Sequence, residues 1–270
     1  MLKMIGIALC CAGVLLAEGV TVPLQDPSRP AKVNVHVMNG NITVRGANIT
    51  HVLVEARSSS GTNLFQHLPE SVDGMKRLDI PGNSGLNITE NSNVVNIGGG
   101  PLLLGGLADL TITVPLHSSL QLSGMSGGGI DVEHVDGEVD ANELSGNITL
   151  KHVDGPIVAH SLNGEIVAIL DRLDSSKPSS FSTMNGNIDV TLPADAKADL
   201  RMKTDNGAVY SDFDVNLGRS NSVIETGPGH MKNGKYRVRF NRVVRGAING
   251  GGPELQFTTF NGQIYIRKAK

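Results

Sequence analysis

Apolar residues recur in a nine-residue pattern through the middle of the chain. Each unit begins with a glycine, and these glycines are Gly128, Gly137, Gly146, Gly155 and Gly164. The third residue is Ile130, Val139, Ile148, Ile157 or Ile166, and the fifth is Val132, Ala141, Leu150, Ala159 or Ala168. Because residues two apart point to the same side of a strand, each unit predicts a short β-strand with two core-facing side chains. The eighth residue is Val135, Leu144, Val153 or Leu162, and we expect it to turn back into the same core.

Turn residues separate these strands, and alternate units resemble each other more than neighbours do. Glu133-His-Val-Asp-Gly137 returns as Lys151-His-Val-Asp-Gly155 eighteen residues later. One coil is therefore two strands long, about 18 residues, and the spacing from Gly186 to Gly207 indicates coils of up to 21. A single coil cannot bury its apolar face, so coils must stack. We predict an all-β fold, a single β-solenoid or β-helix. A hairpin meander or sandwich is the alternative, because Asp-Gly and Asn-Gly pairs also favour hairpins.

The first residues predict an export signal. Lys3 precedes an apolar run over residues 4–16 and small residues follow, which is typical of a secretory signal helix over residues 1–19. The run is too short for a comfortable membrane span, so we expect membrane contact only if this segment stays uncleaved. Both cysteines, Cys10 and Cys11, lie within it. The remaining chain is therefore predicted to lack disulfides and thiol chemistry.

The domain organisation follows from the pattern and the composition. Residues 20–32 are proline-rich and predict a tether, whereas residues 33–270 predict one solenoid domain with a soft boundary near 108–125. The chain has 33 glycines, 3% aromatic residues and no tryptophan, as suits a thin core. The formal net charge of −3 does not point to nucleic acid.

Several signatures in sequence order resemble a known family. They are Leu110-Thr-Ile-Thr-Val-Pro115, Ser126-Gly127, Ile188-Asp-Val-Thr-Leu-Pro193, Thr204-Asp-Asn-Gly207, Gly250-Gly-Gly-Pro253 with Glu254-Leu-Gln-Phe-Thr258, and Asn261-Gly-Gln-Ile-Tyr-Ile266. Over about residues 33–268 this succession resembles the bacterial β-strand repeat family known as "putative adhesin", a domain of unknown function. The resemblance implies an exported bacterial solenoid, and it supplies no catalytic residues.

Motifs that suggest catalysis or metal binding are weak in this chain. Gly124-Met-Ser126-Gly-Gly128 matches a nucleophile elbow, but a strand follows where that motif needs a helix. Calcium-binding nine-residue repeats need several glycines per unit, and here Lys151 stands among the would-be ligands. His134 and His152 are equivalent residues one coil apart, and we expect a solvated stacked pair rather than a metal site. We therefore predict no catalytic, cofactor-binding or metal residues.

Two segments are candidates for contacts with partners. Basic residues alternate with apolar ones late in the chain, and this stripe could bind an acidic envelope polymer: Lys235, Arg237, Arg239, Arg242 and Arg245. A soluble strand face is the simpler interpretation. The uncharged, leucine-rich segment Gly98–Leu107 is expected to cap one end of the stack.

These patterns predict an exported, non-enzymatic protein of the periplasm or cell surface that presents a surface for binding an envelope component such as a polysaccharide. The alternative is a periplasmic structural protein that self-associates through its ends or edges. A carbohydrate-active β-helix enzyme is a third hypothesis, but Asp131 and Asp140 are expected on opposite sides of a coil. We expect neither a cofactor nor a nucleic-acid partner.

Overall fold

The described structure consists of strands and the turns that join them. The computed structural model of the chain describes residues 19–58, 71–72, 75–76, 86–99, 108–126, 128–173, 177–217, 231–232, 235–236 and 243–270. Within these ranges there is no helix, and so none that could cross a membrane. The expected signal helix and most of the expected Gly98–Leu107 cap lie outside them. The all-β prediction is confirmed.

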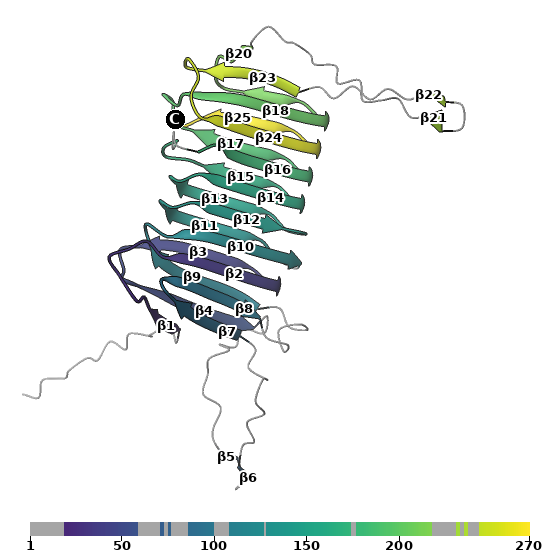
Figure 1. Cartoon of the computed structure of the whole chain (residues 1–270). Helices are drawn as coiled ribbons and strands as arrows, with labels where there is room; N and C mark the ends of the chain where they lie inside the picture. Colours follow the sequence, from purple (N-terminus) through teal and green to yellow (C-terminus); the bar gives the residue numbers. More distant parts are fainter. Residues whose placement is uncertain are drawn as a thin grey trace, which may run out of the picture.

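Two large sheets stack face to face along the length of the molecule (Figure 1). Sheet 1 has ten strands in the spatial order β1 (Val20–Pro23), β4 (His51–Ser58), β9 (Ala108–Pro115), β3 (Ile42–Ala47), β11 (Ile130–Val135), β13 (Ile148–Val153), β15 (Ile166–Ile169), β17 (Ile188–Leu192), β25 (Ile264–Lys268) and β19 (Val209–Ser211). Sheet 2 has eleven, in the order β20 (Asn216–Leu217), β23 (Val243–Ile248), β18 (Ala198–Asn206), β24 (Glu254–Asn261), β16 (Ser179–Asn185), β14 (Ile157–Asn163), β12 (Val139–Glu143), β10 (Ser119–Ser126), β2 (Lys32–Asn39), β8 (Val94–Gly99) and β7 (Leu86–Asn91). Two small hairpins pair β5 (Ser71–Val72) with β6 (Met75–Lys76) and β21 (Met231–Lys232) with β22 (Lys235–Tyr236).

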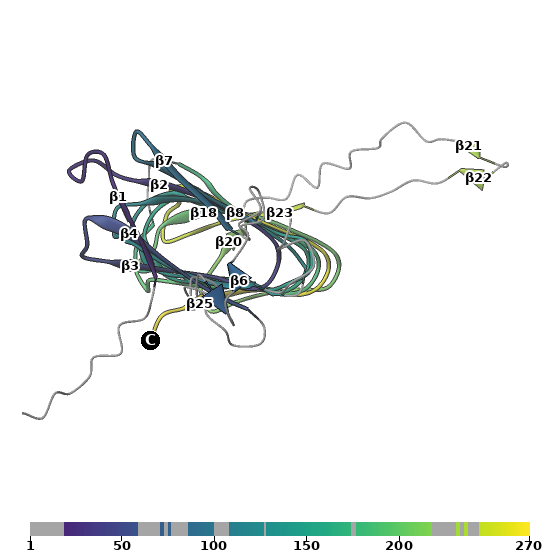
Figure 2. The same cartoon turned by 90° about the horizontal axis from the view of Figure 1, so that it is seen from below.

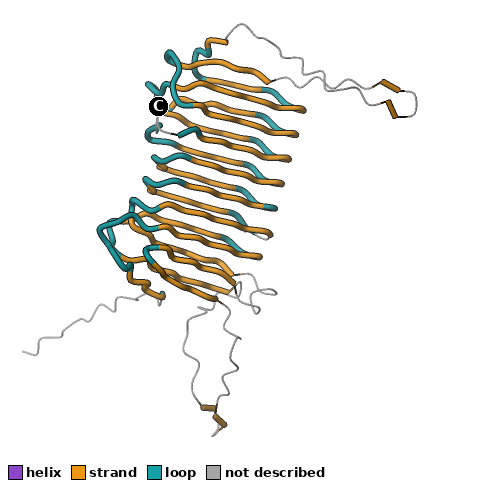
Figure 3. Tube along the Cα trace, in the orientation of Figure 1, coloured by secondary structure: helices purple, strands orange, loops and turns teal. Residues whose placement is uncertain are grey.

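From β10 to β17 the chain alternates between the two sheets, and each strand from β10 to β15 pairs in parallel with the second strand after it. Ile130 lies beside Ile148, and Ile148 beside Ile166, so the register advances by 18 residues. We refer to one strand of sheet 2, the following strand of sheet 1 and the corner between them as a rung. The corners form the two edges of the stack (Figure 3). Parallel pairing excludes a hairpin meander for these strands.

The order of rungs in space departs from the order in the chain at both ends. Rung β24–β25 lies between β16–β17 and β18–β19, and rung β2–β3 lies between β8–β9 and β10–β11. Before β24 the chain turns at Gly250 and Gly251, whose φ angles are 93° and 85°. A Cβ at Gly252 would overlap the carbonyl oxygen of Lys197, just before β18. The Gly-Gly-Gly-Pro signature thus marks the place where the chain passes close to β18 and enters the stack.

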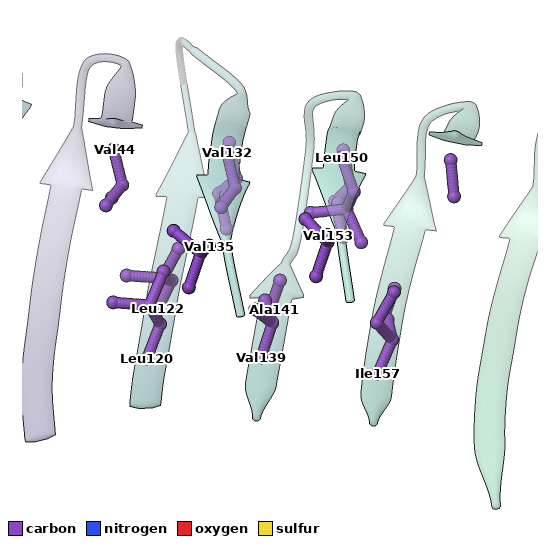
Figure 4. Packing of buried hydrophobic residues seen from close by; sticks show 14 of the residues in the cluster. Val44, Leu120, Leu122, Val132, Val135, Val139, Ala141, Leu150, Val153 and Ile157 are labelled. Carbon is purple, nitrogen blue, oxygen red and sulfur yellow. The ribbon is translucent and has the colours of Figure 1, made fainter. Parts of the chain in front are cut away.

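The core is a thin apolar layer between the sheets. Leu120, Leu122 and Val139 of sheet 2 face Val132 and Leu150 of sheet 1, and all are at most 2% exposed (Figure 4). Aromatic residues enter this layer in register, as Phe181 and Phe257 of neighbouring rungs stack with ring centroids 5.5 Å apart. The alternation of apolar residues predicted from the sequence is confirmed for these strands.

The eighth residue of each unit behaves differently in the two sheets. In sheet 1, Val135 and Val153 are fully buried, as expected. The residues before them, His134 and His152, have φ angles of 58° and 55°, and this left-handed step turns the next side chain inward. Sheet 2 has no such step at this position and keeps strict alternation, so its eighth residue points outward. The expectation is therefore wrong for Leu144, which is 42% exposed.

The segment expected to be a tether is largely docked on the sheets. β1 pairs in antiparallel fashion with β4, and Leu24 and Ala31 are buried. The Asn93 side chain, in the turn between β7 and β8, accepts a hydrogen bond from Asp26 N (2.8 Å) and donates one to Asp26 O (2.6 Å). Residues 20–32 differ from a free tether because strand pairing and this anchor satisfy their backbone groups.

At the corner that leads from sheet 2 to sheet 1, glycines of successive rungs come into direct contact. A Cβ at Gly164 would overlap the carbonyl oxygen of Gly146, and one at Gly186 would overlap that of Gly164. The preceding asparagines form a ladder, in which Asn185 Nδ2 donates to Asn163 Oδ1 and Asn261 Nδ2 to Asn185 Oδ1, both at 2.7 Å. The Asn-Gly corner therefore fixes both the spacing and the register of the rungs.

We predict that Gly164→Ala destabilises the fold by about 3 kcal/mol, because its methyl group must displace backbone rather than a flexible side chain. Urea unfolding followed by far-UV circular dichroism measures the change. Gly98→Ala is the matched control, since a Cβ there meets nothing within 4 Å. Equal stability of the two variants would contradict the role given to the corner glycines.

Candidate functional site: the outer face of sheet 2

The predicted basic stripe is only partly within the described chain. Arg237, Arg239 and Arg242 lie outside it, whereas Lys235 belongs to β22 and Arg245 to β23. Arg245 is exposed and lies beside Arg201 of β18 at the end of sheet 2. The polyanion-binding role of the stripe stays a prediction.

The predicted histidine pair is brought together. The His134 and His152 rings stack with centroids 5.0 Å apart. His152 Nδ1 also lies 2.9 Å from Asp171 Oδ1. Among the described residues, no group of three or more histidines, cysteines, aspartates or glutamates is arranged to hold a metal ion.

The other candidate motifs have structural roles. Ser126 ends β10 and its hydroxyl group donates to Asn39 Oδ1, which places it in the corner ladder. Asp131 and Asp140 lie in different sheets and point to opposite outer faces, as expected. Glu133 and Lys151, the sixth residues of their units, pair with each other at 3.6 Å.

The outer face of sheet 1 carries charges that are paired along the stack. Glu133 lies between Lys151 and Arg45, whose Nε is 3.9 Å from the Glu133 carboxylate. Farther along, Arg267 Nε donates to Asp189 Oδ1 at 2.7 Å. In each of these cross-strand pairs, two oppositely charged side chains neutralise each other on the surface.

The outer face of sheet 2 is nearly free of charge at two central positions of each strand from β8 to β24, whereas β18 beyond them points Asp199, Arg201 and Lys203 outward. Two outward positions on each strand from β8 to β24 form two continuous columns, of which Asp140 is the one formally charged member in these described strands. The columns contain Asn96, Gly98, Asn34, His36, Gln121, Ser123, Asp140, Asn142, Val158, His160, Ser180, Ser182, Gln256 and Thr258. This face therefore presents amide, hydroxyl and imidazole groups at the regular spacing of parallel strands, about 4.8 Å.

An open groove of about 490 Å³ lies at the β7 end of this face. Its lining comes from β7, β8, β2 and β10 and includes Asn87, Asn34, His36, Gln121 and Ser123. Asn34 Nδ2 donates to Asn96 Oδ1 at 2.8 Å. Asn34 Oδ1 is buried and accepts no hydrogen bond from the described residues. The groove thus offers both donors and acceptors, and its lining contains no carboxylate.

The core contains one acidic residue that the sequence pattern did not single out. Glu143, the seventh residue of its unit, is 4% exposed and points inward from sheet 2. It fits because its neighbour in β10 is Gly124, where a Cβ would overlap the Glu143 carboxylate. The Gly124–Glu143 pairing is visible in the sequence only once the register of β10 on β12 is known.

Other rungs place a hydroxyl group where Glu143 stands. Ser161 donates to Gly146 O at 3.0 Å and Thr183 to Gly164 O at 2.9 Å, so each hydroxyl satisfies a corner carbonyl of the neighbouring rung. Burial raises the pKa of Glu143, and the hydrogen bonds from the Ser145 and Leu144 backbone N–H groups only partly oppose this. Glu143 is buried and does not line the groove at the β7 end, so we interpret its carboxyl group as structural.

Comparison with known proteins yields one distant structural likeness. No family model matches the chain, and no curated protein matches it. A similar solved structure is the crystal structure of a "putative cell adhesion protein" from Clostridium sporogenes, with a TM-score of 0.38 and 10% identity, covering 93% of this chain and 100% of that chain. A likeness this distant carries no argument about function. The resemblance to the "putative adhesin" family therefore stays a prediction.

We predict that Glu143→Gln raises the melting temperature at pH 7 by a few degrees, because it removes a buried charge while keeping the shape of the side chain. Since the pKa of Glu143 is raised above 4.5, its contribution to stability is present below that pH and is lost as pH rises through the raised value. In the Glu143→Gln variant, the melting temperature should therefore change less with pH over this range.

Glu133→Gln is the control, because that partly exposed carboxylate is paired with Lys151 and its removal should give no gain in melting temperature at pH 7. Melting curves from pH 4 to pH 8 provide the measurement. A wild-type profile that Glu143→Gln leaves unchanged would show that the carboxyl group is not held in a desolvating site.

Proposed function

We propose that this chain is an exported, non-enzymatic β-solenoid that binds a neutral polysaccharide of the cell envelope or cell surface through the outer face of sheet 2. The observation that carries the proposal is the uncharged groove at the β7 end of that face, which continues into two columns of hydrogen-bonding side chains.

The chemistry of the groove favours a polyhydroxylated ligand without charge. Amides and hydroxyl groups both donate and accept hydrogen bonds, which matches the hydroxyl groups of a sugar chain. A charged polymer would have no oppositely charged side chain to pair with there, because the groove is lined by neutral residues such as Asn34, Gln121 and Ser123. Stacked rungs also repeat the same groups along one line, as suits a polymer.

The same lining argues for binding rather than hydrolysis. Glycoside hydrolysis commonly requires two carboxyl groups that flank the scissile bond. The groove lining contains neither an aspartate nor a glutamate, and Asp131 and Asp140 point to opposite faces of the stack.

The proposal includes export of the protein and its membership of the "putative adhesin" family. The support for export is the signal-like pattern of residues 1–19. The support for membership of the bacterial "putative adhesin" family is the ordered set of Val-Pro, Leu-Pro and Gly-Gly-Gly-Pro signatures in the sequence. An adhesion module of the envelope or surface accords with both.

We predict that the protein is retarded in native gels containing a neutral polysaccharide such as mannan or dextran, and that His36→Ala/Gln121→Ala weakens this at least fivefold. Both side chains line the groove and neither belongs to the core. The matched control is Thr43→Ala/Thr149→Ala, which removes outward side chains from sheet 1.

Equal weakening by the two double variants would show that the binding is not at the groove. Retardation by acidic polysaccharides alone would contradict the proposal and would favour the basic stripe around Arg245 instead. A protein retarded by none of a panel of neutral polysaccharides would overturn the assignment of the face.

A further inference from the structure

An exposed apolar stripe runs along the corner where strands leave sheet 2. Six consecutive rungs each contribute one eighth-position residue or its equivalent, and the stripe consists of Met38, Met125, Leu144, Leu162, Met184 and Phe260. Five of these side chains are 37–46% exposed, and Leu162 is half-buried. The stripe lies along the edge marked by the arrowheads of β10, β14, β16 and β24 (Figure 1).

The register makes the stripe continuous. Gly124 pairs with Val37 and Glu143, which places Met125 between Met38 and Leu144. The same counting through Ser161, Thr183 and Thr259 aligns Leu162, Met184 and Phe260. Five steps of about 4.8 Å give a length of about 24 Å. The inserted rung extends the stripe, because β24 places Phe260 next to Met184.

No formal charge borders the stripe over these six rungs of the described structure. On one side lies the corner column, which consists of Asn39, Ser126, Ser145, Asn163, Asn185 and Asn261. On the other side lie the sixth-position residues of sheet 2, which are His36, Ser123, Asn142, His160, Ser182 and Thr258. The first charges appear one rung farther, where Lys203 pairs with Asp205 at 3.6 Å.

The size and shape of the stripe argue against a second copy as its partner. With five side chains 37–46% exposed, the stripe presents on the order of 400 Å² of apolar surface, which is the size of the largest patch on a typical monomer, and such patches are often functional. It is about half of the roughly 800 Å² that each partner buries in a standard interface. It also lies on the rounded end of the section seen along the stack (Figure 2). Two convex ridges touch along a line and bury little.

We propose that this stripe docks on a lipid surface, with the long axis of the stack lying along the bilayer. A deformable lipid surface can cover all six side chains of the convex stripe at once. Flexible methionine side chains, of which the stripe has three, adapt well to such a fluid partner. Because neither border is basic, the ridge suits a zwitterionic interface rather than an anionic one.

The test uses tryptophan as a local probe, because the chain contains none. Leu144→Trp places it in the stripe. Val158→Trp places it on the flat face of sheet 2, at a residue that is 44% exposed against 42% for Leu144. Fluorescence of each full-length variant is recorded with phosphatidylcholine vesicles, with and without brominated lipid as quencher. The apolar run of residues 4–16 is the same in both variants, so it cannot produce a difference between them.

We expect vesicles to blue-shift the emission of Leu144→Trp and brominated lipid to quench it, with Val158→Trp unaffected. Adding Met125→Gln, Met184→Gln and Phe260→Gln should weaken the vesicle affinity at least tenfold while the far-UV spectrum stays unchanged. Equal responses of the two probes, or no response of either, would overturn the proposal. So would a blue shift that depends on protein concentration without lipid, because the stripe would then bind a second copy.

Discussion

The close contact between corner glycines is the constraint on which the rest of the structure depends. At the corner from sheet 2 to sheet 1, the glycine of each rung lies against a carbonyl oxygen of the neighbouring rung, with no room for a side chain. The asparagine ladder and the inward hydroxyl groups satisfy the polar atoms around it. Only with this spacing can residues such as Leu122 and Leu150 of the two sheets fill a thin core in register. The outward side chains of successive rungs then line up in ordered columns on the outer faces.

Those columns give the two faces and the edge different chemistry. Sheet 1 carries paired charges, as at Glu133 and Lys151. From β8 to β24, sheet 2 carries mainly neutral hydrogen-bonding groups and an open groove. The edge between them carries apolar side chains from Met38 to Phe260. One backbone arrangement thus presents three surfaces of different chemistry, each repeated along the stack.

The sequence predicts the parts of this fold that depend on local periodicity. The two inward positions, the 18-residue step and the stacking of His134 on His152 all follow from alternation and spacing. The insertion of β24 beside β16 does not, because it is a long-range choice between chemically similar edges. The outward turn of Leu144 also escapes prediction, since it depends on the left-handed step that His134 takes in sheet 1 and that sheet 2 lacks at this position. The groove requires the β7–β8 hairpin to be placed beside β2, which no repeat specifies.

Disulfide trapping of the rung order tests this account most directly, because β24 extends the neutral face and the stripe beyond β16 only if it lies between β16 and β18. Ser180 pairs with Gln256, and Gln256 with Arg201. In a chain with Cys10→Ser and Cys11→Ser, we expect Ser180→Cys/Gln256→Cys to form a disulfide on mild oxidation, since neighbouring strands lie about 4.8 Å apart. Ser180→Cys/Arg201→Cys should stay reduced, with about twice that separation. A disulfide in the second variant and none in the first would show that the rungs stack in chain order and would contradict the account.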